Sequence, residues 1–183
     1  PETSTVTVDE EGNVVSSNIE SKDSSITFTG HHGALHSTVV APFIKTSGNK
    51  AHLGSGYEVY HVEGKNMLQY TEDDHIDANK RTGDGIFGHG TAQWTKEGDT
   101  LTLSASDVRY KEQQGTRDGK VEGVDQLFMG MYSSENKPEL DDAHLTLKVS
   151  SGCGQKKEEM PQDQEKPQNE PAPVSYTHLR AHE

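Results

Sequence analysis

The alternation of apolar and polar positions is clearest in the stretch Thr91–Ser104 (TAQWTKEGDTLTLS). Leu101 and Leu103 alternate with the polar residues on either side of them, which is the period of a half-buried β-strand. Gly98 lies between the two apolar segments and can adopt the positive φ that a tight hairpin loop requires. The stretch therefore predicts a β-hairpin.

Short runs of this kind recur between residues 25 and 149 and are separated by Gly, Asn and Asp, which favour turns. A helical period continues for no more than about two turns before residue 150. The predicted strands are Ile26–Thr29, Leu35–Lys45, Tyr57–Glu63, Asn66–Thr71, Ile86–Trp94, Thr100–Ala105, Val108–Lys111, Gln126–Tyr132 and His144–Val149. This pattern predicts an all-β fold: an antiparallel up-and-down barrel or sandwich of about eight strands with disordered tails.

Two positions within these runs predict local irregularity. Pro42 lies inside Leu35–Lys45 and has no N–H to donate, so that run is predicted to be an edge strand or to contain a bulge. Four glycines around Phe87, at positions 83, 85, 88 and 90, predict a sharp bend or the close approach of another segment. A barrel corner and a ligand contact both fit such a glycine-rich strand.

The two ends of the chain differ in composition from the middle. Residues 1–24 are mostly Ser, Thr, Asp, Glu and Asn, and form either a polar leader or a short hairpin. Residues 25–150 are predicted to be the β-domain. Residues 151–183 are rich in Pro, Glu, Gln and Lys and cannot bury enough apolar surface to offset their chain entropy, so a disordered tail is expected.

Composition restricts the partners that the protein can have. Hydrophobic residues make up 29% of the chain and the formal net charge is -13, which disfavours nucleic acid because two polyanions repel. The single cysteine, Cys153, excludes an intrachain disulfide. No apolar run is long enough to cross a membrane, so no membrane span is expected.

Two segments resemble known sequences. Gly90–Ala92, Trp94 and the strand Gly98–Leu103 resemble the lipocalin-like domains of bacterial exported proteins. That resemblance implies a small antiparallel barrel with an apolar interior, and a periplasmic or cell-surface location. The last ten residues, VSYTHLRAHE, resemble a peptide translated from sequencing-adapter DNA, so residues 174–183 are interpreted as non-native.

Histidine is the enriched reactive residue, with ten in the chain. His31, His32 and His36 form the tightest group and are the candidate metal ligands, because imidazole is a common ligand of zinc. If His32 and His36 converge on one ion, a third ligand would have to come from His52, His61 or Asp74 in a distant segment. The alternative interpretation is a solvated loop of histidines that titrate with pH.

Aromatic residues on the predicted strands are the other candidates for a site. Tyr60, Tyr70, Phe87 and Trp94 are the predicted ligand-binding residues, because rings with polar edges line small-molecule cavities. The alternative is that they fill the core of a small barrel.

Three functions fit the sequence. The first is a non-catalytic exported β-barrel domain that binds a small apolar molecule or a protein partner, with no cofactor. The second is a metal-dependent enzyme that uses a histidine and aspartate site. The third is a structural, adhesin-like surface module, against which the absence of a fixed repeat period counts. We expect the first, without catalytic activity.

Overall fold

The structure is a computed structural model that describes residues 4–65, 69–111, 123–128, 132, 138–149 and 174–177. Nearly all of its regular structure is antiparallel β-strand, which confirms the predicted all-β class. The strands are β1 (Thr5–Val8), β2 (Val14–Glu20), β3 (Ser25–Gly30), β4 (Leu35–Ser47), β5 (Lys50–Tyr60), β6 (Lys80–Glu97), β7 (Thr100–Tyr110), β8 (Ala143–Lys148) and β9 (Val174–Thr177). Short 3₁₀ turns are η1 (His31–Gly33), η3 (Glu72–Asp74), η4 (Asp77–Asn79) and η5 (Gly123–Phe128).

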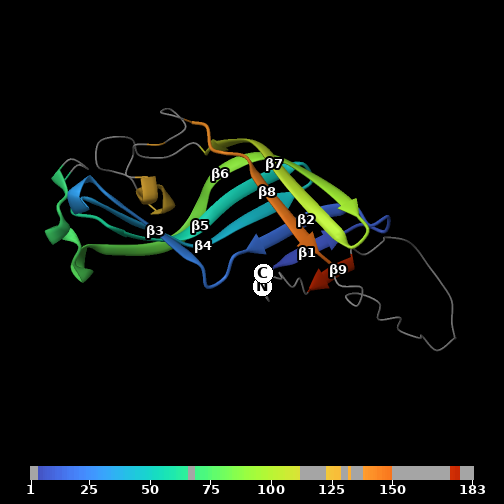
Figure 1. Ribbon diagram of the computed structural model, residues 1–183, viewed down its shortest axis with the longest axis horizontal. Helices are drawn as coiled ribbons and strands as arrows, with labels where there is room; N and C mark the ends of the chain where they lie inside the picture. The colour runs from blue at the N-terminus through green and yellow to red at the C-terminus, as the bar shows by residue number, and fades with distance from the viewer. Residues whose placement is uncertain are drawn as a thin grey trace, which may run out of the picture.

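The sheet follows the chain in an up-and-down order (Figure 1). Its strand order is β8-β7-β6-β5-β4-β2-β1-β9, and β3 pairs with β4 beyond the end of β2. Every pairing is antiparallel, and short turns join β1 to β2, β3 to β4, β4 to β5 and β6 to β7. Longer segments join β5 to β6 and β7 to β8, and β3 lies in the chain between the neighbouring strands β2 and β4. β9 comes from the far end of the chain and pairs with β1.

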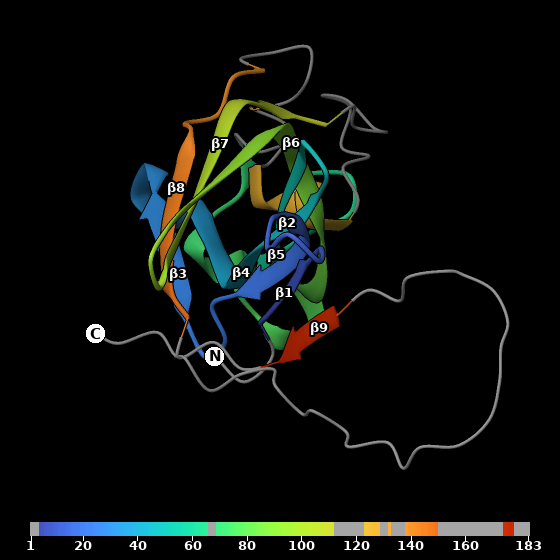
Figure 2. The same ribbon diagram turned by 90° about the vertical axis from the view of Figure 1, so that its right-hand side faces the viewer.

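The sheet curls so that strands far apart in this order share one interior (Figure 2). Leu101 and Leu103 of β7 face inward and are 5% and 0% exposed, which confirms the predicted alternation. Val6 of β1 packs in one cluster with Leu101, and Leu147 of β8 packs against that cluster. In the described part of the chain, side chains therefore close the curled sheet between β1 and β8.

The other end of the interior is covered by η5. Its Val124 and Leu127 form a buried cluster with Val59 of β5. A side chain in place of Gly85 would put a Cβ 2.9 Å from Val124, so the glycine allows η5 to approach the sheet. The close approach expected from the glycine-rich strand is therefore present at this position.

The bulge predicted at Pro42 is confirmed. The register between β4 and β5 shifts between Val40 and Phe43, and Ala41 has a φ of 45°. The bulge divides β4 into two parts: its first half pairs with β3 and its second half with β2. The long strand β4 therefore pairs along one of its sides with two shorter strands, β3 and β2, one after the other.

Other predicted strand boundaries were wrong. Thr100–Ala105 and Val108–Lys111 belong to one strand, β7, in which Asp107 has a φ of 53°. Residues 126–128 form part of η5 instead of a strand, since burial of Leu127 on top of a sheet produces the same apolar signal as a strand. Residues 69–71 lie outside any strand, and the rest of the predicted strands over 66–71 and 126–132, Tyr132 apart, falls outside the described residues.

The N-terminal segment joins the sheet. Its two strands form a hairpin, and β2 pairs with β4, so the sheet begins ahead of residue 25. Within the predicted tail, residues 174–177 form β9, while 151–173 and 178–183 fall outside the described residues. Among the described residues no helix has the length and apolar character needed to cross a membrane.

Candidate functional site

A cavity of about 360 Å³ opens at the end of the curled sheet where the β1–β2 and β4–β5 turns meet β6. Its floor and walls come from segments distant in the chain. The lining residues are Glu11, Gly12, Asn13, Val14, Gly48, Asn49, Ala92, Gln93, Trp94, Thr95, Lys96 and Leu101. Of the four residues predicted to bind a ligand, Trp94 is the one that lines this cavity.

Trp94 is held in a fixed orientation. It lies opposite Leu103 in the register between β6 and β7, and its half-buried ring packs against two core clusters. Its indole N–H donates a hydrogen bond of 3.3 Å to Thr46 Oγ1, which lies 2.8 Å from Ser17 Oγ. Because both hydroxyls are buried, this chain of polar groups fixes the ring from the interior side.

The β1–β2 turn at the cavity mouth is shaped by Asp9. Its carboxylate accepts backbone hydrogen bonds from Glu11 (3.0 Å) and Asn13 (2.7 Å), and a third from the Asn13 side chain (3.1 Å). The hydrogen bonds from Asn13 are the main reason that the pKa of Asp9 lies below its ordinary value. The turn therefore keeps a negative charge and a defined shape beside the cavity.

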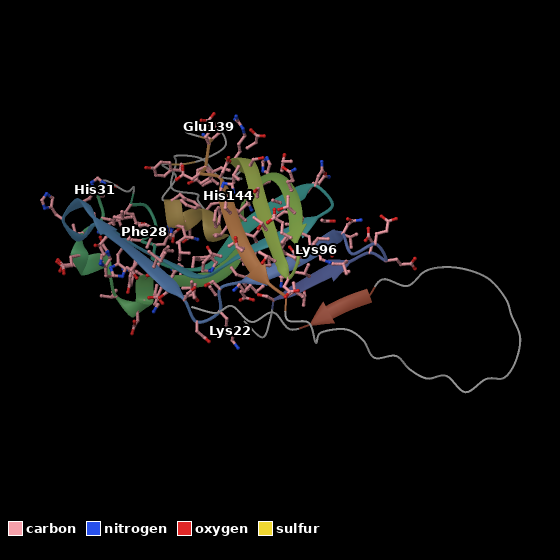
Figure 3. The ribbon with its side chains drawn as sticks, turned by 45° about the vertical axis from the view of Figure 1, so that its right-hand side comes forward. Lys22, Phe28, His31, Lys96, Glu139 and His144 are labelled. Carbon is pink, nitrogen blue, oxygen red and sulfur yellow. The ribbon has the colours of Figure 1, made fainter. Side chains whose placement is uncertain are left out.

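The side-chain ammonium of Lys96 lies at this cavity mouth, beside the β1–β2 turn. Gly12 has a φ of 85°, and a Cβ added there would lie 3.4 Å from Lys96 Nζ. Lys96 extends from the end of β6 that leads into the β6–β7 turn (Figure 3). The rim thus offers an ammonium, a carboxylate from Glu11 and amides, whereas Trp94 supplies the apolar wall together with Val14, Ala92 and Leu101.

The other predicted ligand-binding residues lie elsewhere and do not form one site with Trp94. Tyr60 packs against His75, with ring centroids 4.8 Å apart. Tyr70 is buried, and its hydroxyl accepts a hydrogen bond of 3.0 Å from the backbone N–H of Val62. Phe87 meets Phe128 of η5 at 5.4 Å between ring centroids and so belongs to the core.

The histidines proposed as metal ligands are separated. His31 and His32 are exposed in the η1 turn, where both have positive φ angles. His36 lies on β4 and contacts His75, which follows η3, with ring centroids 5.0 Å apart. Among the described residues no group of three or more His, Cys, Asp or Glu side chains is placed to hold a metal ion, so the structure does not assemble the predicted site.

The residues that hold Trp94 in place and those that form the cavity rim were missed from the sequence. Ser17 and Thr46 are 29 positions apart, and Thr46 and Trp94 are 48 apart, so no local spacing signals their contact. The turns that form the rim carry Asn13 and Asn49, which the sequence marks as turn residues but not as parts of one site.

Comparison of the chain with protein-family models, curated proteins and solved structures found no match.

Proposed function

We propose that the protein binds a small molecule in the cavity beside Trp94, and that the ligand has an apolar, flat portion and a hydrogen-bonding end. The cavity volume of about 360 Å³ supports the proposal, because small-molecule sites occupy roughly 300–1,000 Å³. The apolar portion would lie against the indole and Leu101, and the polar end would reach the amides and Lys96 at the rim.

Preorganisation supports binding at this place. The hydrogen bond to Thr46 holds the indole ring in position before a ligand arrives. The bonds to Asp9 do the same for the β1–β2 turn. A site with a fixed shape loses less conformational entropy on binding, which favours affinity.

The lining favours binding over catalysis. The described residues around the cavity include no Ser, Cys or His, so they offer no serine–histidine or cysteine–histidine pair of the kind that activates a nucleophile. A non-catalytic binding domain is thus the proposed class. Export to the periplasm or cell surface, and the absence of a nucleic-acid partner, stay predictions from the sequence.

Trp94 itself provides the assay, since it is the single tryptophan of the chain. Titration with a panel of small amphipathic and aromatic compounds should shift or quench its emission with saturation for at least one class. Val14→Phe, which adds bulk to the cavity wall, should weaken that response about tenfold or more.

Val15→Phe is the matched control. Val15 is the next residue after Val14 in β2, but its side chain is 40% exposed and does not line the cavity. It should leave the titration unchanged. Saturable binding that responds equally to both substitutions, or no saturable binding in the whole panel, would contradict the proposed function.

A further inference from the structure

The strand β3 is a sheet edge. In the part of the chain that the structure describes, β3 pairs with β4 and with no other strand. Figure 1 shows it at one end of the molecule, away from the turns around the cavity. A free edge presents unpaired backbone N–H and C=O groups, which can pair with a strand from another chain.

The backbone groups at this edge can be identified. Ala41 N–H donates to Ser24 C=O over 2.8 Å, so Ser24 is one of the residues that bond to β4. Because bonding direction alternates along an antiparallel strand, Ile26 and Phe28 also direct their backbone groups to β4. Ser25, Thr27 and Thr29 direct theirs to the free edge.

The side chains of this edge are apolar on one face and lack charge on the other. Ile26 and Phe28 are 58% and 52% exposed. Register places them on the same face as Val39 and Val59, the face that η5 covers further along the sheet. Natural edge strands usually carry charges or proline against pairing, and β3 has neither.

We propose that β3 is a homodimerisation edge, at which two copies of the chain pair antiparallel around a two-fold axis through Thr27. In this register Ser25 of one copy faces Thr29 of the other, so all the outward backbone groups identified above are bonded. Ile26 of one copy faces Phe28 of the other, so the exposed apolar side chains cover each other.

At the edge itself, charge does not oppose a second copy as the partner, and the strand's self-complementary register fits one. A chain of net charge -13 repels another copy over most of its surface, but β3 itself is uncharged. Lys22 and His31 lie beyond opposite ends of the strand, with Phe28 between them (Figure 3). β3 itself therefore places no charged side chain in the proposed interface.

Thr27→Pro is the deciding variant. It removes the N–H at the centre of the proposed interface but no backbone hydrogen bond to β4, because this N–H points to the free edge. It also removes the side-chain hydrogen bond between Thr27 and Thr38 of β4, so its fold is checked separately. The measurement is sedimentation equilibrium of the full chain over about 1 µM to 1 mM, a range suited to weak pairing. We expect a monomer–dimer equilibrium, weakened about tenfold or more by Thr27→Pro.

Thr27→Ser is the matched control, since it keeps both the N–H and a hydroxyl for the bond of 2.9 Å with Thr38. It should dimerise like the unchanged protein. Circular dichroism confirms that each variant is folded; if the proline variant is not, Phe28→Lys, which places a charge in the interface, takes its place. A chain that stays monomeric throughout, or a dimer that the folded disrupting variant leaves intact, would overturn the proposal.

Discussion

Leu103→Ala tests whether the curled sheet encloses a packed interior. Leu103 is fully buried in a cluster whose other members include Ala51, Ala92 and Ala105. Those neighbours are small and lie on hydrogen-bonded strands, so they cannot move into the space that the leucine vacates. We therefore expect the upper part of the range for such substitutions, about 3–5 kcal/mol of lost unfolding free energy.

Urea denaturation followed by circular dichroism measures this loss. Domains of this size unfold with about 5–15 kcal/mol, so the substitution removes a large share of the total. With a slope of about 2 kcal/mol per molar urea, the midpoint should fall by about 2 M. Trp94 lies opposite Leu103, so its fluorescence gives a second, local record of the same transition.

Thr102→Ala is the matched control. Thr102 is the preceding residue on β7, and its side chain points to the other face of the sheet. We expect this variant to lose less than about 1 kcal/mol. Equal losses for the two variants, or a loss below about 1 kcal/mol for Leu103→Ala, would refute the assignment of an inner face to β7.

Three further predictions concern polar groups. Thr46→Val leaves the Trp94 indole N–H without its acceptor, and we expect a loss of about 1–3 kcal/mol in denaturation together with a shift in Trp94 emission; an unchanged emission would argue against this hydrogen bond. Chiefly through its hydrogen bond, Lys65 lowers the pKa of Asp74 below 3.8, so the resulting stabilisation is present above pH 3.8 and is lost as the pH falls through the lower, folded-state pKa. The stability of the unchanged protein should therefore converge with that of Asp74→Asn in acid, and parallel pH curves would contradict this. Burial raises the pKa of Tyr110 from 10.0 to about 12, so stability should decrease as the pH rises from 10 toward 12, and Tyr110→Phe should remove the last step of a tyrosine absorbance titration.

Much of the fold could be predicted because its signals are local. The alternation around Leu101 and Leu103, the turn at Gly98 and the bulge at Pro42 each depend on a few adjacent residues. Where the same apolar signal has two structural origins, the prediction failed. Leu127 and Phe128 are apolar because η5 lies on the sheet, and the sequence gives no sign of which kind of element is buried there.

The candidate site could be predicted only in part. Trp94 was identified as an aromatic residue on a predicted strand, whereas Ser17, Thr46 and the β1–β2 turn were not connected with it. Tyr60 and Phe87 satisfy the same sequence criterion as Trp94, yet one lies beside His75 and the other beneath η5. The presence of an aromatic residue on a predicted strand therefore pointed to Trp94 but did not distinguish it from aromatic residues that lie elsewhere.

The sequence by itself determined which side chains of a strand lie together, because side-chain direction alternates with every residue of an extended chain. It also determined where many of the turns occur, because glycine, asparagine and proline restrict or release the backbone locally. Only the tertiary structure decided which face of the sheet became the interior and which turns met at the cavity. Those outcomes depend on how the whole sheet curls, which brings Val6 against Leu101 and Trp94 to Thr46 across long stretches of chain.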